Sequence, residues 1–157
     1  MKISNNKLEG VSYKATPNKS GVIIPKYIVM HYDAASNATS AINWMCDPKS
    51  QVSAHLHISR DGVITQLVDF NVKAWHAGAS EWKGLTGLNS HSIGIELQNS
   101  GTQEYKDIQI QKAVEVCEAL VKNYPIKEII GHSDIAPKRK ADPGKQFPWT
   151  RFKTIIK

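Results

Sequence analysis

Residues 92–98 have the sequence SIGIELQ, in which apolar side chains alternate with small, charged or polar ones. The three apolar residues share one face, and Gly94 and Glu96 share the other, which is the period of two typical of a β-strand. A longer stretch downstream repeats its apolar side chains with the 3.6-residue period of a helix. This stripe consists of Ile110, Ala113, Val114, Cys117, Leu120, Val121 and Tyr124. A strand followed by an amphipathic helix indicates an α/β fold, in which helices cover a sheet.

Short apolar or alternating runs elsewhere predict the rest of the sheet. These runs lie at residues 26–31, 53–59, 63–68 and 128–132. The dipeptide Asp61-Gly62 separates the second run from the third and is a strong turn signal, so we expect these two runs to form a hairpin. In the second run, the polar face of the predicted strand carries His55 and His57.

The chain is expected to form one domain over residues 1–157. It contains no internal repeat, low-complexity tract or Pro/Gly/Ser-rich linker that would separate two domains. Residues 38–46 predict a helix that ends near Asp47-Pro48, and residues 1–25 predict an irregular N-terminal lead-in. The resulting fold class is α/β, a single domain with a central mixed β-sheet flanked by α-helices.

Composition excludes several classes of protein. Hydrophobic residues make up 41% of the chain and charged residues 22%, as in globular proteins. No run of about 18 apolar residues is present, so no membrane insertion is expected. The polar N-terminus lacks the apolar core of a secretory signal, so we expect synthesis in the cytoplasm without a signal peptide. Two cysteines, Cys46 and Cys117, form no CxxC pair and indicate no disulfide framework.

The formal net charge of +6 favours an acidic partner, such as nucleic acid, an anionic membrane or an anionic cell wall. The basic residues are spread along the chain, and they cluster only at residues 138–140, Lys-Arg-Lys. Basic triplets of this kind are common on solvated protein surfaces. We therefore predict no nucleic-acid partner.

Two histidines and an aspartate near strand ends are candidate zinc ligands. His31 ends one predicted strand, His132 ends another, and Asp142 follows ten residues later. Two imidazoles and one carboxylate, with a fourth position open to water, form a common ligand set for catalytic zinc. Spacing alone does not select these three, because the six histidines of the chain allow other combinations.

Other polar residues have both a functional and a structural interpretation. His55 and His57 point the same way on a strand and could bind a metal, although single histidines are usually structural or solvated. Glu96 lies between two apolar residues, where a buried carboxylate needs a partner or a function. A place on the solvated face of its strand would explain Glu96 equally well. Lys140 belongs to the basic triplet, for which solvation is the default.

Five stretches together resemble the type-2 N-acetylmuramoyl-L-alanine amidases, a family that includes phage lytic amidases, muropeptide-recycling amidases and peptidoglycan recognition proteins. The stretches are IVMHYDAA (28–35), VSAHLHISRDGVITQLV (52–68), AWHAG (74–78), SIGIELQN (92–99) and GHSDIAPKRKADPG (131–144). They occur in the order found in the family, and the last is the most specific. The resemblance implies a zinc-dependent hydrolase of the amide bond between N-acetylmuramic acid and L-alanine. It also implies a zinc site at one edge of a surface groove.

The resemblance implies roles for individual residues. His31, His132 and Asp142 would bind the zinc ion. Glu96 would be the acid–base carboxylate, and Lys140 would lie beside the last ligand and stabilise the developing oxyanion.

The resemblance bears on the groove as well. His55 and His76 match positions that line the substrate groove. Two residues depart from the family pattern: His57 occupies a usually apolar position, and Asp33 occupies one that commonly holds a small or hydroxyl residue.

The predicted partner is peptidoglycan or a muropeptide, bound by a monomer. Trp75 and Trp149 could contact its sugar or peptide, or could belong to the core. The enzyme would act on the cell wall after release, as a phage-type lysin, or on muropeptides in the cytoplasm. The alternative function is a zinc-free peptidoglycan-binding module. The complete ligand set and Glu96 favour the enzyme.

Overall fold

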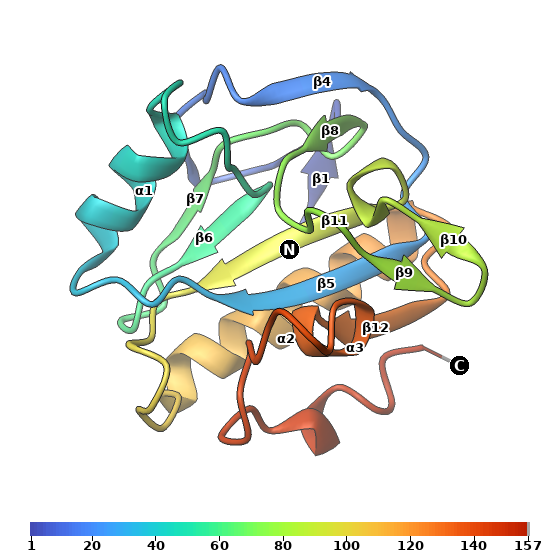
Figure 1. Ribbon diagram of the computed structural model, residues 1–157. Helices are drawn as coiled ribbons and strands as arrows, with labels where there is room; N and C mark the ends of the chain where they lie inside the picture. Colours follow the sequence, from blue (N-terminus) through green and yellow to red (C-terminus); the bar gives the residue numbers. More distant parts are fainter. Residues whose placement is uncertain (157) are drawn as a thin grey trace.

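A six-stranded sheet forms the centre of the computed structural model, which describes residues 1–156 (Figure 1). Its strands are β3 (Ser12–Tyr13), β5 (Tyr27–Tyr32), β6 (Leu56–Ile58), β7 (Ile64–Gln66), β11 (Ser92–Leu97) and β12 (Glu128–Gly131). They lie in the order β12-β5-β11-β6-β7-β3. Neighbouring strands are parallel, except that β6 and β7 form an antiparallel hairpin. The predicted α/β fold with a mixed sheet is confirmed.

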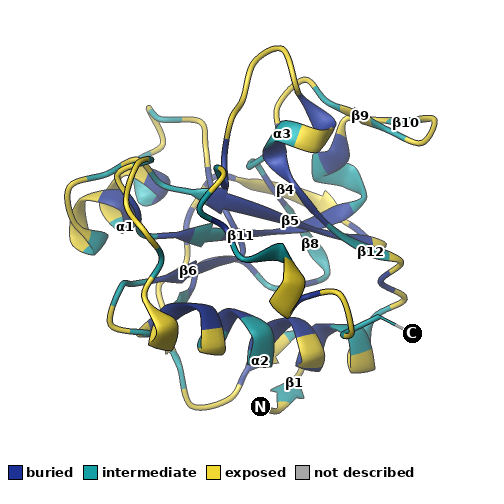
Figure 2. Cartoon of the chain, turned by 90° about the horizontal axis from the view of Figure 1, so that it is seen from below, coloured by how far each residue is buried: buried dark blue, intermediate teal, exposed yellow. Residues whose placement is uncertain are grey.

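Helices and short strand pairs surround this sheet. The helices are α1 (Ala38–Cys46), α2 (Asp107–Asn123) and α3 (His132–Ile135), with the 3-10 turns η1 (Leu88–Ser90) and η2 (Trp149–Arg151). The strand pairs are β1 (Ile3–Ser4) with β2 (Lys7–Leu8), β4 (Lys19–Val22) with β8 (Val72–Ala74), and β9 (Glu81–Trp82) with β10 (Leu85–Thr86). Figure 2 shows α2 on one face of the sheet and α3 on the other. Within residues 1–156, no helix is both long and apolar enough to cross a membrane.

The apolar face of β11 packs against α2. The three apolar side chains of β11 have no exposed surface and share a core cluster with Ile110, Cys117 and Leu120 of α2. Burying one large apolar side chain stabilises a fold by about 1.5–3 kcal/mol. This layer therefore holds α2 on the sheet and leaves the opposite face of β11 for polar residues.

The opposite face carries a row of polar side chains near the strand ends. The parallel register pairs Glu96 of β11 with His31 of β5 on one side and with His57 of β6 on the other. His132 follows β12 directly, and the last residue of β12 is in register with the residue before His31. Neighbouring strands lie about 4.8 Å apart. The register alone therefore brings these side chains together from distant parts of the sequence.

Two elements differ from the sequence prediction. The alternating run at 53–59 forms a strand only at Leu56–Ile58, and His55 and His57 of its polar face are buried. The segment 1–25, predicted to be irregular, contains four strands of two to four residues, of which β3 joins the edge of the central sheet. These strands lack apolar alternation. β1 and β2 pair with each other, whereas β3 and β4 form because the distant strands β7 and β8 supply their hydrogen bonds, a contribution that local propensity does not contain.

Candidate metal centre

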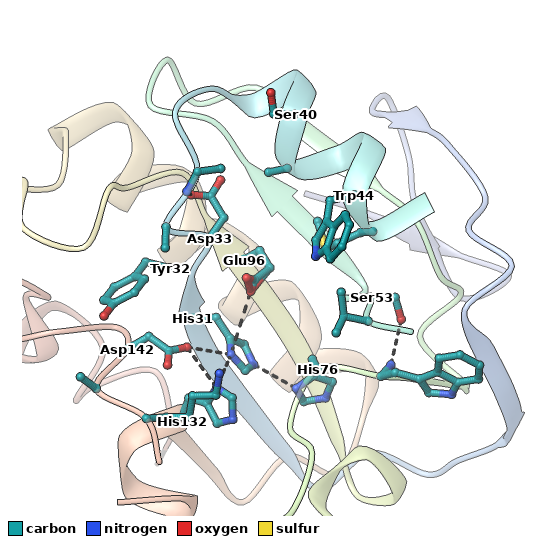
Figure 3. A pocket seen from close by; sticks show the side chains of 18 of the residues that line it. His31, Tyr32, Asp33, Ser40, Trp44, Ser53, His76, Glu96, His132 and Asp142 are labelled. Atoms are coloured by element: carbon teal, nitrogen blue, oxygen red, sulfur yellow. Dashed lines mark hydrogen bonds and ion pairs between the residues drawn. The ribbon is translucent and has the colours of Figure 1, made fainter. Parts of the chain in front are cut away.

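Three side chains converge near the ends of β5 and β12 (Figure 3). His31 Nδ1 lies 3.0 Å from His132 Nδ1 and 2.9 Å from Asp142 Oδ2, and His132 Nδ1 lies 3.1 Å from Asp142 Oδ2. All three residues are buried. The structure thus brings together the three side chains proposed as ligands, in a group with the spacing of a metal site.

The loop that carries Asp142 is held against the end of β12. The Ser133 N–H donates to the Asp142 carbonyl at 2.9 Å, which ties the loop to the start of α3. Gly131 makes the close approach possible, because a Cβ at this position would lie 2.8 Å from the Pro143 ring. A residue with a side chain there would push the loop, and with it Asp142, away from His132.

The three atoms fit a tetrahedral metal ion. Ligand atoms 2.0–2.1 Å from zinc are about 3.3 Å apart in a tetrahedron, close to the observed 2.9–3.1 Å. His132 Nε2 donates to the Ala77 carbonyl at 2.9 Å, so in the neutral ring Nδ1 carries its lone pair toward the carboxylate. A lone pair and a carboxylate oxygen repel at this distance, whereas a cation between them would attract both.

Burial and the neighbouring groups act in opposite directions on these residues. Burial raises the pKa of Asp142, but the adjacent His132 and His31 rings outweigh it and hold the pKa well below its usual value. Burial lowers the pKa of His31, against the opposing effect of the adjacent Asp142 carboxylate. The centre therefore favours an ionised carboxylate and a neutral His31 ring, which are the protonation states that metal binding requires.

Glu96 lies beside these three residues. Its Oε2 is 4.0 Å from His31 Nδ1, and its side chain is 17% exposed. Burial raises the pKa of Glu96 well above its usual value, the anions of Asp142 and Asp33 raise it further, and the Lys140 ammonium opposes them. The interpretation as a solvated surface glutamate does not describe this position. A carboxylate with a raised pKa next to a metal site suits proton transfer near neutral pH.

A groove of about 820 Å³ opens over the centre. Its lining includes His76, for which the resemblance implies a place along the groove, and Lys140, for which it implies a place beside the last ligand. Lys140 is exposed, and its charge lowers the pKa of both His31 and Glu96. The Lys140 ammonium therefore acts on the region where substrate would react. Figure 3 shows Tyr32, Ser40, Trp44 and Ser53 around the same groove.

His55 lies outside the groove lining. Its Nε2 donates to the Val72 carbonyl at 2.7 Å, and its Nδ1 accepts from the Gly94 N–H at 3.1 Å. Burial lowers the pKa of this fully buried ring to about 4, so the ring is neutral near pH 7. The predicted substrate contact would require one of these bonds to break. Both nitrogens are occupied, so His55 has none left to share a metal with His57.

The two residues that depart from the family pattern contact each other. His57 Nε2 donates to Asp33 Oδ2 at 2.9 Å, and both side chains are buried. Asp33 Oδ1 accepts from the N–H groups of Ala35 and Asn99 at 3.0 and 3.1 Å. His57 Nδ1 has no hydrogen-bond partner in the described part of the chain. The pair therefore joins the end of β5 to β6 across the intervening strand β11.

We expect the two members of this pair to be coupled in stability. His57→Leu alone leaves the buried Asp33 carboxylate without one donor. Asp33→Ser alone leaves the buried His57 ring without its acceptor. Each substitution should therefore destabilise the protein by about 1–3 kcal/mol. The double substitution restores the usual family types and should recover most of this loss. Urea unfolding of the wild type and the three variants measures the coupling. Strictly additive losses would show that the contact has no energetic role.

The tryptophans divide between groove and core. Trp75 lines the groove, and its Nε1 donates to Ser20 Oγ at 3.0 Å. Trp149 packs against Phe147 in the core cluster. Trp44 on α1 also lines the groove and is 57% exposed, and it is absent from the sequence prediction. An aromatic residue off the buried stripe of an amphipathic helix is the signal that identifies such a position.

Sequence comparisons give a consistent set of relatives. The family model described as N-acetylmuramoyl-L-alanine amidase (Amidase_2) matches residues 19–145. The chain is 48% identical over 108 residues to 1,6-anhydro-N-acetylmuramyl-L-alanine amidase AmpD of Escherichia coli K12, covering 68% of this chain and 59% of AmpD. It is 38% identical over 145 residues to N-acetylmuramoyl-L-alanine amidase AmiD of the same strain, covering 81% and 51%. The chain thus spans between half and three fifths of the length of these two relatives.

Solved structures share the fold. A Se-Met derivative of AmpD matches with a TM-score of 0.86 and 34% identity over 100% of both chains. AmiD from E. coli, in complex with anhydro-N-acetylmuramic acid-L-Ala-D-gamma-Glu-L-Lys, matches with a TM-score of 0.78 and 34% identity, covering 95% of this chain and 60% of that one. The family match spans most of the sequence and includes His31, Glu96, His132 and Asp142. The chain therefore belongs to the N-acetylmuramoyl-L-alanine amidase family.

Proposed function

We propose that this protein is a zinc-dependent amidase that cleaves the bond between anhydro-N-acetylmuramic acid and L-alanine in muropeptides, and that it acts in the cytoplasm. The observation that carries the proposal is the convergence of His31, His132 and Asp142 beside Glu96 in a groove (Figure 3). Several relatives of 44–48% identity are named as amidases of the 1,6-anhydro sugar, which favours anhydro-muropeptides over intact wall. The matching endolysin structure, at 22% identity, supports the fold alone.

Zinc is the metal that we assign to the centre. Two imidazoles and one carboxylate leave a fourth position open, and this is a ligand set of catalytic zinc sites. A bound Zn²⁺ supplies Lewis acidity, which polarises a carbonyl and lowers the pKa of water toward ~7. The lowered pKa values of His31 and Asp142 favour a neutral ring and an ionised carboxylate, which suit its binding.

The side chains around the centre would transfer the protons and stabilise the charge that develops during the reaction. Glu96 would take the proton of the attacking water and pass it to the leaving nitrogen. The water oxygen bonds to the lactyl carbonyl carbon as the C–N bond breaks, which yields a carboxylate and the free amine of L-alanine. The Lys140 ammonium would stabilise the negative charge that develops on the carbonyl oxygen. Trp44 and Trp75 would offer flat surfaces to sugar or peptide.

Product analysis by mass spectrometry tests the proposed bond and substrate. The zinc-loaded protein, incubated with anhydro-muropeptide, should release peptides with a free L-alanine amino terminus and leave the sugar intact. Intact peptidoglycan should be cleaved more slowly by about 10-fold or more, the discrimination that a few pocket contacts supply.

Three results would contradict the proposal in different ways. New reducing sugar ends would mean glycosidase action. Equal rates on both substrates would mean a lysin rather than a recycling enzyme. Binding of muropeptide without any cleavage by zinc-loaded protein would mean the alternative function, a peptidoglycan-binding module.

A further inference from the structure

Both histidines of the candidate centre contact one dipeptide through the nitrogen that faces away from the metal position. His132 Nε2 donates to the carbonyl of Ala77 at 2.9 Å. His31 Nε2 lies 3.0 Å from Nδ1 of His76. His76 and Ala77 follow β8 and are 45 and 55 residues from the histidines that they contact. Two consecutive residues therefore provide the hydrogen-bond partners of both rings.

The hydrogen bonds of Ser92 decide which atom donates between His31 and His76. Ser92 Oγ lies 2.5 Å from the Leu88 carbonyl, which can only accept, so the single hydroxyl proton is used there. His76 Nε2 lies 3.2 Å from the same Oγ and must therefore be the donor. The Nδ1 atom of the neutral His76 ring is then an acceptor, and His31 Nε2–H donates to it. The proton of His31 is thus directed to Nε2, and the lone pair of its Nδ1 faces Asp142.

Asn89 holds the dipeptide in place. Its Oδ1 accepts from the N–H of His76 at 3.0 Å and from the N–H of Ala77 at 2.7 Å. Asn89 belongs to η1. The Leu88 carbonyl of the same turn accepts the hydrogen bond of the Ser92 hydroxyl. The His76 ring also rests on Gly94, where an added Cβ would lie only 2.4 Å from the ring. One turn and one glycine therefore position the whole segment.

We infer that the dipeptide His76-Ala77 is an acceptor clamp that directs Nδ1 of both His31 and His132 toward the metal, and that Ser92 and Asn89 are positioning residues for this clamp. The inference rests on the proposed metal site but not on the identity of the substrate. Its physical basis is that a neutral imidazole binds metal through one nitrogen only when the other nitrogen keeps the proton. Each ring here is given an acceptor for that proton.

In this arrangement Ser92 determines, through His76, which nitrogen of His31 carries the proton. Without the Ser92 oxygen, His76 has no acceptor at Nε2 and can move its proton to Nδ1, which faces His31. His31 Nε2 would then become the acceptor, and its proton would move to the nitrogen that faces the metal. His132 would be unaffected, because its acceptor is a backbone carbonyl. Asn89, in contrast, supports both halves of the clamp.

Histidine tautomers read by ¹⁵N NMR test the clamp directly. In metal-free and in zinc-loaded protein, we expect His76 as the Nε2–H tautomer. In zinc-loaded protein, we expect protected Nε2–H protons on His31 and His132. The Nδ1–H tautomer of His76 in the wild type would overturn the inference whether or not the protein binds zinc.

Zinc affinity, measured by competition with a chelator, tests the positioning residues. Changes to residues that orient a metal ligand typically weaken affinity about 10–100-fold, and we expect Ser92→Ala and Asn89→Ala to fall in this range. Asn89→Asp keeps both acceptor functions and should restore tight binding. Ser59→Ala is the matched control, because Ser59 is a partly buried serine outside the groove lining whose Oγ accepts from the Val63 N–H and bonds to neither ring. We expect unchanged zinc affinity and an unchanged His76 tautomer in this control.

These readouts separate the clamp from the proposed activity. Wild-type zinc affinity in Ser92→Ala, with the His76 tautomer unchanged, would overturn the role of Ser92. Equal losses in Ser92→Ala and Ser59→Ala would show a general packing effect and would also overturn it. Tight zinc binding and the expected tautomers in a protein that cleaves no muropeptide would contradict the proposed function and leave the clamp standing.

Discussion

Replacing His132 with alanine is expected to empty the zinc site and abolish turnover. The change deletes one of the three proposed ligands and leaves Asp142 with a single imidazole neighbour, His31. Changes to residues that only orient a ligand already weaken metal affinity about 10–100-fold, so the loss of a ligand should weaken it more. Zinc per chain, measured by elemental analysis after dialysis, should fall from about one to near zero. Amidase activity should fall below detection.

Two further variants sharpen this test. His91→Ala is the matched control, because His91 is a partly buried histidine outside the groove lining, and its zinc content should stay at the wild-type value. Asp142→Asn keeps the shape of the ligand but removes its charge, and it should also lose zinc. Full zinc occupancy in His132→Ala would rule out the assigned centre.

Replacing Glu96 with glutamine is expected to lower kcat by about 10²–10⁴-fold, the usual contribution of general acid–base catalysis. The amide keeps the shape of the side chain but cannot accept the proton of the attacking water. Zinc content should be unchanged, because Glu96 Oε2 lies 4.0 Å from His31 Nδ1 and is not one of the three proposed ligand atoms. Substrate affinity should change little, so the loss should appear in kcat rather than in KM.

The same substitution makes a prediction about stability. The pKa of Glu96 is raised by burial, so the folded protein holds this proton more tightly than the unfolded chain does. Stability is therefore lost as pH rises above the ordinary pKa of a glutamate toward this raised pKa, and glutamine removes that loss. Metal-free Glu96→Gln should therefore unfold at the same or a higher urea concentration than the wild type at pH 7.

An exposed glutamate provides the control for both measurements. Glu118→Gln changes an exposed carboxylate on α2, which covers the opposite face of the sheet, and it should leave kcat and stability within error of wild type (Figure 2). A Glu96→Gln protein that keeps zinc and stays within a few-fold of wild-type turnover would show that the proton travels by another route.

Sequence pattern predicts the fold well where each side chain faces either the core or water. The alternation in β11 and the helical period of α2 arise because their apolar faces pack against each other, and this packing leaves a direct trace in the order of residues. The hairpin at Asp61-Gly62 is local in the same sense, and Gly62 has the positive φ that such a turn favours. The family, too, is evident from five motifs in order.

The polar residues show where sequence pattern stops. His55 and His57 have the same spacing as a metal-binding pair, yet one bonds to backbone at both nitrogens and the other pairs with Asp33. The Nδ1 atoms of His31 and His132 lie 3.0 Å apart, although the two residues are separated by 101 positions in the sequence. No local sequence pattern marks either residue. Only the family resemblance singled them out in the sequence, because spacing along the chain carries no information about distance across a sheet.

By itself, therefore, the sequence determined the α/β class, the strand and helix that build the core, and the family. Tertiary structure alone decided which polar side chains meet, which are buried, and which nitrogen of each histidine faces the proposed metal position. The physical reason is that the apolar residues on the buried face of a helix or strand recur every few residues, so a short stretch of sequence reveals that face. Hydrogen-bond direction depends on single acceptors, such as the Ala77 carbonyl and Ser92 Oγ, that strand register and loop packing bring from elsewhere in the chain.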